Sequence, residues 1–314
     1  MASETAAYYD ANTARFLRFG RGAASMAIHR AVWAPGVLTR MEAMRYVDNL
    51  MLFELVELMS TPGGPTARRG RVRSTESSGL TVVDLGCGVG GSVTHLEQHL
   101  PGSYYGVTNS RVQQQKATEA SARRGLRATF YVDDYNDRGL YESRLPTGTV
   151  DLVYMIESFV HAADPAVVFE GVAKLLRPGG RLIICDDTLH SETAADSDVV
   201  QAFRRGWHAH SLLTLERTTD LAHAAGLHLR EERDLTQYVE LRRPRDRVIR
   251  LIAPLFPRLG LKGPFWDNMY GGNALQIGLL SGLIQYRYMV FEASSNSPDS
   301  SGVGPASSTT PSRK

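Results

Sequence analysis

The sequence predicts an α/β fold: one domain on a doubly wound, mainly parallel, seven-stranded sheet, with a helical N-terminal region and a helical lid insertion. Three observations lead to this class. Short apolar runs alternate with segments of helical pattern, as expected when crossover helices join parallel strands. A glycine-rich segment, VVDLGCGVGG, overlaps the first such run and continues past it. The chain has 314 residues, of which 43% are hydrophobic and 22% charged, enough for a full core.

Each strand is predicted from a short apolar run bounded by turn residues. The expected strands are residues 81–85, 103–108, 128–132, 150–155, 181–186, 227–235 and 284–292. The last of them, IQYRYMVFE, alternates in character and therefore predicts an edge strand. Helical periodicity or composition predicts helices at residues 112–124, 165–176 and 215–225. RPGG at 177–180 predicts a turn that leads into the next strand.

Composition divides the chain into segments. Residues 61–79 are rich in Pro, Gly, Ser and Arg, and predict a flexible linker between a helical region at 1–60 and a core at 80–293. Residues 294–314 lack large apolar side chains almost entirely and predict a disordered tail. An apolar and aromatic insertion at about 236–283 is expected to form a lid or substrate wall over the carboxyl ends of the strands; ordinary core packing is the alternative.

Charge and cysteine content exclude several classes of protein. A formal net charge of +2 gives no reason to expect nucleic acid as a partner. Two cysteines, Cys87 and Cys185, are too few for a disulfide framework, so we expect a reducing, cytoplasmic setting. The sequence predicts neither a secretory signal nor a transmembrane segment. Residues 248–261 mix Arg with Ile, Leu and Phe, which allows weak peripheral membrane contact, although two prolines interrupt them.

The glycine-rich segment fits two kinds of nucleotide site. Its glycines satisfy both G-x-G-x-x-G and G-x-G-x-G: Gly86, Gly88, Gly90 and Gly91. A nicotinamide site needs a carboxylate near the end of the next strand to bind the ribose hydroxyls. That place is GVTNS, which offers Thr108 and no carboxylate. The acid is instead Asp84, two residues before the first glycine, which argues against a dehydrogenase.

Four motifs in fixed order resemble those of class I S-adenosylmethionine-dependent methyltransferases, which have a Rossmann-like fold. DLGCGVGG resembles the first motif, whose acid serves the methionine amino group. VDDYND resembles the third-strand motif, whose acid meets the adenine amino group. VDLVYMIES resembles the fourth-strand motif, and LLRPGGRLII the helix, turn and strand that follow. The resemblance implies S-adenosylmethionine as the cofactor, with these contacts: Asp84, Gly86, Gly88, Gly90, Asp134, Tyr135 and Ile156.

Within that family, GVTNSRVQQQKA resembles a segment of the small-molecule C-methyltransferases, among them the sterol, tocopherol and isoprenyl diphosphate enzymes. There a Thr and a Gln, here Thr108 and Gln113, replace the usual acid near the ribose and methionine. YYDANTARFLRFG resembles the lead helix that closes over the cofactor in this group. This resemblance implies that Tyr9 is a cofactor-binding lid residue and that residues 1–60 form a cofactor lid.

The segment IESFVHAAD resembles a characteristic stretch of the same C-methyltransferases and supplies the catalytic candidates, Glu157 and His161. Methylation of an alkene carbon leaves a carbocation that must be stabilised and then lose a proton, and a partly buried carboxylate can do both. Glu157 is therefore the expected base. The alternatives are that Glu157 caps a turn or touches the cofactor, and that His161 is structural.

Basic and aromatic residues after the fifth strand are candidates for substrate binding: Arg204, Arg205, Trp207, His208, Trp266 and Tyr270. The arginines, with those at 242, 243, 245 and 247, could clamp a diphosphate, and the aromatic rings could line an isoprenoid pocket. A solvated charged face is the alternative for the arginines. The sequence shows no metal-binding cluster, so Mg²⁺ is expected only if a diphosphate brings it.

The sequence therefore predicts a methyltransferase that acts on a carbon of a small apolar metabolite, a terpenoid or prenyl diphosphate, in secondary metabolism. One alternative is O- or N-methylation of a natural-product intermediate. A more distant one is a protein that binds S-adenosylmethionine without catalysis.

Overall fold

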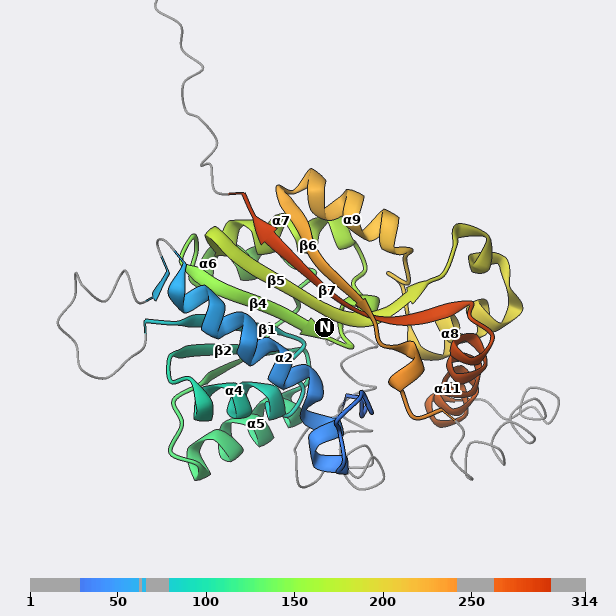
Figure 1. Ribbon diagram of the computed structural model, residues 1–314, viewed down its shortest axis with the longest axis horizontal. Helices are drawn as coiled ribbons and strands as arrows, with labels where there is room; N and C mark the ends of the chain where they lie inside the picture. The colour runs from blue at the N-terminus through green and yellow to red at the C-terminus, as the bar shows by residue number, and fades with distance from the viewer. Residues whose placement is uncertain (1–28, 62–63, 66–78, 242–262, 295–314) are drawn as a thin grey trace, which may run out of the picture.

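The computed structural model of the chain describes residues 29–61, 64–65, 79–241 and 263–294. A seven-stranded sheet runs through its centre with helices on both faces, which confirms the predicted fold class (Figure 1). The strand order is β3-β2-β1-β4-β5-β7-β6. The strands are β1 (Thr81–Leu85), β2 (Ser103–Thr108), β3 (Thr129–Val132), β4 (Val150–Ile156), β5 (Leu176–Leu189), β6 (Leu227–Asp234) and β7 (Ile284–Ala293).

Two helical layers cover the sheet. One comprises α2 (Arg40–Ser60), α4 (Gly91–His99) and α5 (Arg111–Arg123), and the other comprises α6 (Arg138–Ser143), α7 (Pro165–Leu175) and α9 (Leu215–Ala224). The other helices among the described residues are α8 (Asp198–Trp207), α11 (Pro264–Leu280) and the short η1 (Phe159–His161), η2 (Glu192–Asp196) and η3 (Thr236–Tyr238). Two separate apolar clusters fill the two layers. None of the helices in the described part of the chain is both long and apolar enough to cross a membrane.

The α2 helix begins at a capping box. The Thr39 side chain accepts a hydrogen bond from the Glu42 backbone N–H, and the Glu42 side chain accepts one from the Thr39 backbone N–H. The helix then buries Met51, Leu55 and Leu58 against the sheet. The α2 helix, which falls within the predicted N-terminal lid at residues 1–60, is thus part of a layer of the core. The lid candidate Tyr9 lies outside the described residues.

The prediction of an edge strand at residues 284–292 is wrong. The corresponding strand, β7, lies between β5 and β6 and pairs antiparallel with both, so β6 is the edge. The polar side chains that produced the alternation are paired with acids of β6: Gln285 with Asp234 and Arg287 with Glu232. An alternating pattern therefore marked a paired polar face and not a free edge.

The RPGG turn lies inside β5 as an irregular bulge and not before the strand. The register against β4 moves from Val150 opposite Leu176 to Leu152 opposite Arg181, which leaves residues 177–180 as the extra backbone. Arg177 Nε donates to Asp151 Oδ1 at 2.7 Å, and the Thr81 N–H donates to Asp151 Oδ2 at 2.9 Å. This buried pair ties the bulge to the start of β1.

Candidate active site

The carboxyl ends of the parallel strands bring the predicted site residues to one edge of the sheet. Asp84 of β1 is in register with Gly106 of β2 and with Tyr154 of β4, and Ile156 of β4 is in register with Cys185 of β5. The loops that follow β1, β2, β3 and β4 therefore meet at the same edge. In open α/β sheets this edge is where ligands bind.

The loop after β1 has a backbone that only glycine adopts without strain. Gly86, Gly88 and Gly90 have φ values of 100°, 53° and 76°. The N–H groups of Gly86 and Cys87 both donate to the Val107 carbonyl at 2.9 Å, which fixes the loop to β2. A Cβ at position 86 would lie 2.7 Å from Ser158 Oγ and closer still to its Cβ, so the loop also packs directly on the segment after β4. A tight, glycine-rich cradle results, in which the backbone can approach a nucleotide cofactor closely.

Asp84 lies buried beside this cradle and is 4% exposed. Burial raises the pKa of its carboxyl group well above the ordinary value, and the charge of Asp48 on α2 adds to the rise, while the Tyr154 hydroxyl opposes it. No described lysine or arginine forms an ion pair with Asp84 to offset that penalty. A cationic ligand would favour the ionised carboxylate.

The end of β2 carries a hydrogen-bonded chain. Ser110 caps α5 by accepting from the Gln113 N–H at 3.1 Å, and the Thr108 hydroxyl donates to Gln113 Oε1 at 2.7 Å. All three side chains are buried. Because its oxygen is occupied, the Gln113 amide presents its NH₂ group as a donor, and a neutral donor at this place suits a ribose oxygen or a carboxylate.

The segment after β3 is held by its own polar groups. Asp134 Oδ1 accepts from the Asn136 N–H at 2.9 Å and from Asn136 Nδ2 at 2.7 Å. The Tyr135 hydroxyl donates to the Ser158 carbonyl at 2.7 Å, so this segment is tied to the residue after Glu157. The end of β3 and the end of β4 therefore form one wall of the site.

Glu157 follows β4 and has the left-handed φ of 50°, which is uncommon for a residue other than glycine. Its N–H donates to the Cys185 carbonyl at 2.9 Å. Its Oε1 accepts two hydrogen bonds, from the Arg30 N–H at 2.7 Å and from the Tyr286 hydroxyl at 3.0 Å. The side chain is 18% exposed. A strained residue with one carboxylate oxygen fixed and partial access to solvent is typical of a functional position.

Two aspartates of β5 lie beside Glu157. Arg30 forms a bidentate ion pair with Asp187, with both N–O distances at 2.6 Å. Burial lowers the pKa of the Arg30 guanidinium, but the nearby carboxylates of Asp187 and Glu157 raise it by more. The pKa of Arg30 is therefore raised. Burial raises the pKa of Asp186 to about 8, so that this group is mostly protonated at neutral pH. The cluster then holds two carboxylates against one guanidinium.

His161 of η1 is half-buried. Burial lowers the pKa of its imidazole to about 4, and its Nδ1–H donates to the His208 carbonyl at 3.3 Å. The ring is thus neutral at physiological pH and is oriented by backbone.

The predicted substrate residues divide into two groups. Arg204 donates to the Leu212 carbonyl at 2.9 Å and Arg205 is exposed, so neither is directed at Glu157 by a described contact. Trp207 Nε1 donates to the Asn268 carbonyl of α11 at 3.0 Å, and Tyr270 of α11 packs on the same apolar cluster as Trp207. His208 ends α8 with φ 52°, and Trp266 lies in the first turns of α11, half-buried. The arginines at 242, 243, 245 and 247 lie outside the described residues.

In its described residues the chain has no group of three His, Cys, Asp or Glu side chains arranged to hold a metal ion.

A family model described as "Methyltransferase domain" matches residues 76–235. The chain belongs to this methyltransferase family.

The relatives of the methyltransferase act on different molecules. Methyltransferase GfsG of Streptomyces halstedii is 30% identical over 225 residues, covering 69% of this chain and 74% of that protein. The probable tocopherol O-methyltransferase of Oryza sativa is 33% identical over 136 residues, and sterol 24-C-methyltransferase erg6 of Aspergillus fumigatus is 33% identical over 104 residues. These two matches cover 36% and 26% of the relatives, so this chain spans only about a third or less of each.

Solved structures share the fold of the methyltransferase. Geranyl diphosphate C-methyltransferase of Streptomyces coelicolor matches with a TM-score of 0.64 and 15% identity, covering 93% of this chain and 97% of that one. The [4+2]-cyclase SpnF matches with a TM-score of 0.65 and 16% identity, covering 94% and 98%. At such identities the likeness concerns the fold alone.

Membership of the family points to S-adenosylmethionine as the cofactor, and the glycine cradle fits it. The positive-φ glycines leave room for it, and Asp84 lacks a described cationic partner, which the methionine ammonium group would supply. When bound, the cofactor would supply an electrophilic methyl group on sulfur, and the residues around it would align that group with an acceptor.

Sequence reasoning missed three residues around Glu157. Asp187 belongs to the acidic pair that ends the fifth apolar run, and this pair at a strand end was a usable signal. Arg30 and Tyr286 had no such signal, because they lie 127 and 129 residues from Glu157 in the chain.

Proposed function

We propose that this enzyme transfers the methyl group of S-adenosylmethionine to a carbon atom of a small, apolar, prenyl-type molecule, with Glu157 as the base. The observation that carries the proposal is the Glu157 carboxylate after β4. One of its oxygens is fixed by Arg30 and Tyr286, and no described residue forms a hydrogen bond with the other, Oε2. That oxygen is available to an acceptor.

The charge around Glu157 suits this chemistry. Methylation of an alkene carbon generates a carbocation, which a net negative site stabilises and a carboxylate deprotonates. Glu157 and Asp187 together exceed the single charge of Arg30, and protonated Asp186 adds none. His161 is neutral and adds no repulsive positive charge.

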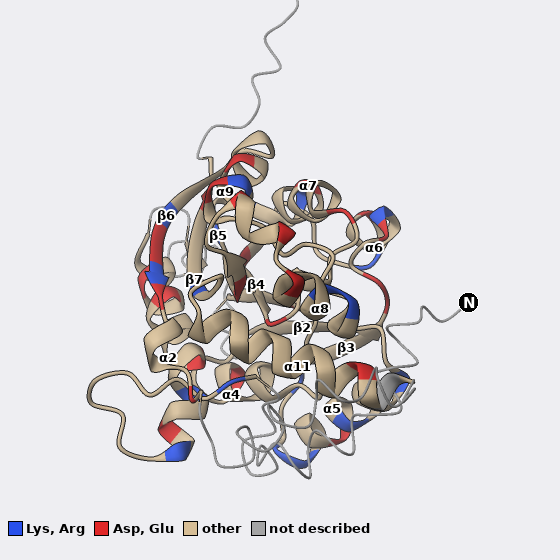
Figure 2. Cartoon of the chain, turned by 90° about the vertical axis from the view of Figure 1, so that its right-hand side faces the viewer, with Lys and Arg blue, Asp and Glu red and all other residues tan. Residues whose placement is uncertain are grey.

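The surroundings and the relatives support an apolar acceptor. The α11 helix carries a single charged residue, Asp267, and Figure 2 shows it almost entirely free of charge beside α8. Relatives include sterol 24-C-methyltransferases and a 2-methyl-6-phytyl-1,4-hydroquinone methyltransferase, and a neighbour of the same fold binds Mg²⁺ with geranyl diphosphate. We extend the proposal to secondary metabolism in the cytoplasm, with Mg²⁺ entering only alongside a diphosphate.

A second candidate is methylation of a hydroxyl group. The Tyr286 hydroxyl and Glu157 form a hydrogen-bonded pair at 3.0 Å, and the same carboxylate could remove the proton of an acceptor hydroxyl. Tocopherol O-methyltransferases are among the relatives, which supports this candidate as well.

Labelled cofactor distinguishes the candidates. The protein is incubated with S-adenosylmethionine that carries a ¹³C methyl group. Each reaction also contains one class of acceptor: prenyl diphosphates, prenylated quinols, apolar alkenes, phenols or amines. Carbon NMR of each product then identifies the atom that bears the label. We expect label on carbon, with a diphosphate acceptor requiring added Mg²⁺; label found only on oxygen or nitrogen would overturn the proposal.

A further inference from the structure

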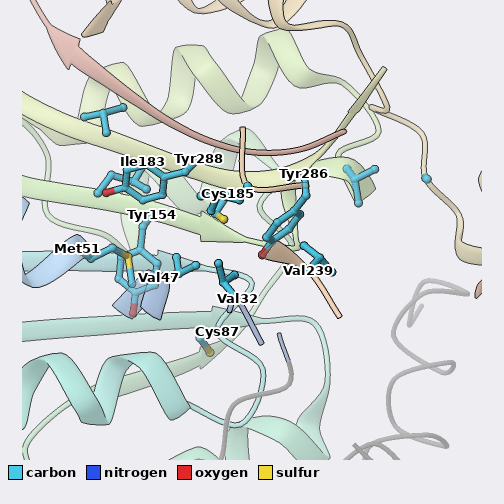
Figure 3. Packing of buried hydrophobic residues seen from close by; sticks show 14 of the residues in the cluster. Val32, Val47, Met51, Cys87, Tyr154, Ile183, Cys185, Val239, Tyr286 and Tyr288 are labelled. Atoms are coloured by element: carbon cyan, nitrogen blue, oxygen red, sulfur yellow. The ribbon is translucent and has the colours of Figure 1, made fainter. Parts of the chain in front are cut away.

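A short segment at residues 29–34 lies between the α2 helix and the carboxylates of the candidate site. Its consecutive side chains diverge: His29 faces Asp48 of α2 at 3.8 Å, and Arg30 faces Glu157 and Asp187. The Val32 N–H donates to the Ala43 carbonyl at 2.9 Å, and Val32 forms an antiparallel bridge with Val239. In Figure 3, Val32 lies among the buried residues that also include Cys185 and Tyr286. The segment is therefore anchored beside the site by backbone as well as side chain.

Arg30 makes four contacts around the carboxylates. Both terminal nitrogens of its guanidinium donate to the Asp187 carboxylate oxygens at 2.6 Å. The guanidinium carbon lies 4.7 Å from the centre of the Tyr286 ring. Its Nε lies 3.9 Å from Glu157 Oε1, and its backbone N–H donates to that same oxygen at 2.7 Å. The side chain thus holds its own backbone in the place where it fixes Glu157.

We propose that Arg30 is a positioning residue for Glu157: by clamping Asp187, it fixes its backbone N–H on Glu157 Oε1, so that Oε2 alone faces the acceptor. This inference rests on the proposed role of Glu157 as the base. It assigns Asp187 as the anchor of the clamp. A merely structural ion pair is the alternative, and the two make different predictions for the titration of Glu157.

The charges of the clamp act on Glu157 in opposite directions. The groups that face Glu157 are Arg30 from the 29–34 segment, His161 from η1, Cys185, Asp186 and Asp187 from β5, and Tyr286 from β7. Arg30 favours the ionised form of Glu157, whereas Asp187 disfavours it. Removal of each partner should therefore move the titration of Glu157 in opposite directions, which loss of fold or of general packing would not do.

The test measures ionisation directly, without an acceptor. The protein is labelled with ¹³C at the glutamate side-chain carboxyl carbon, and the Glu157→Gln variant assigns the Glu157 signal. We expect the midpoint of its titration to move in one direction in Arg30→Gln, in the opposite direction in Asp187→Asn, and back towards the wild-type value in the double variant. Arg30→Lys should keep the midpoint near wild type, because it keeps the charge.

Turnover separates charge from geometry. With the acceptor found by methyl labelling, Arg30→Gln, Arg30→Lys and Asp187→Asn should each lower kcat about 10- to 100-fold while the acceptor KM changes little, because the base is misplaced and binding is not. Arg40→Gln is the matched control: Arg40 pairs with Glu240 at 2.9 Å outside the cluster and should leave the titration of Glu157 and kcat unchanged. Thermal unfolding identifies variants that fail to fold.

The outcomes separate this inference from the proposed function. If Glu157→Gln retains turnover, Glu157 is not the base and the proposed function fails. If Glu157→Gln is inactive but the Arg30 and Asp187 variants keep the wild-type kcat, or shift the Glu157 midpoint in the same direction, the pair is structural and the clamp is refuted.

Discussion

Replacement of Gly86 by alanine should damage stability and cofactor binding together. At φ 100° an L-residue is strained, which costs about 1–2 kcal/mol. The new Cβ would lie 2.7 Å from Ser158 Oγ, and such overpacking costs about 1–3 kcal/mol. Ser158 would have to move, which weakens the 2.7 Å hydrogen bond from its hydroxyl to the Leu85 carbonyl, worth about 1 kcal/mol. We expect a total loss of roughly 3–6 kcal/mol in the free energy of unfolding.

Two other glycines divide this cost into its parts. Gly148 has φ 65°, and a Cβ added there would meet no atom within 4 Å, so Gly148→Ala should show the backbone strain alone. Gly106 is not among the positive-φ glycines, but its Cβ would lie 2.6 Å from the Phe130 ring, so Gly106→Ala should show the steric part alone. Urea unfolding and calorimetric titration with S-adenosylmethionine give the two readouts. If Gly86→Ala costs no more than Gly148→Ala and binds the cofactor normally, the close packing of the loop on Ser158 is refuted.

Three further predictions concern charged and polar groups. Because burial raises the pKa of Asp84, affinity for S-adenosylmethionine should fall as pH drops through that raised value, and calorimetry across pH should show proton release on binding. Without cofactor, the buried Asp84 carboxyl group lowers the free energy of unfolding as pH rises above the ordinary aspartate range. Asp84→Asn should therefore stabilise the free enzyme at neutral pH and weaken cofactor binding. If the variant binds S-adenosylmethionine normally, the assignment of Asp84 to the cofactor is wrong. Asp151→Ala leaves buried Arg177 without its carboxylate and should cost about 3–5 kcal/mol by urea unfolding, whereas Glu142→Ala, paired with exposed Lys174, should cost little. Thr108→Val removes the hydrogen bond to Gln113 Oε1, worth about 1 kcal/mol, and lets the Gln113 amide rotate. Cofactor binding should therefore weaken about tenfold. Unchanged affinity would contradict the role of Thr108 in orienting the amide.

Local patterns in the sequence were sufficient for most strands and helices. The runs TVVDL and SYYGVT became β1 and β2 with the predicted bounds, and α7 ends within one residue of its prediction. The sheet order was harder, since the alternation of β7 is the same whether its polar side chains meet water or the acids of β6.

In the candidate site, too, the positions of residues along the strands could be predicted from the sequence, but their contacts could not. Asp84, Thr108 and Glu157 each lie within one residue of the end of a strand, so motif and position alone were sufficient to predict that they lie at one edge. Their electrostatic surroundings could not be predicted, because the partners of Glu157 come from a segment before α2 and from the last strand. Such contacts depend on how distant elements pack, and no local spacing encodes them.

The most direct test of Glu157 as the base is a single-turnover measurement on Glu157→Gln with the identified acceptor, combined with cofactor binding on the same sample. We predict methyl transfer slowed by about 100-fold or more, with the Kd for S-adenosylmethionine changed by less than about tenfold, or 1.4 kcal/mol. Methyl transfer near the wild-type rate would contradict the account.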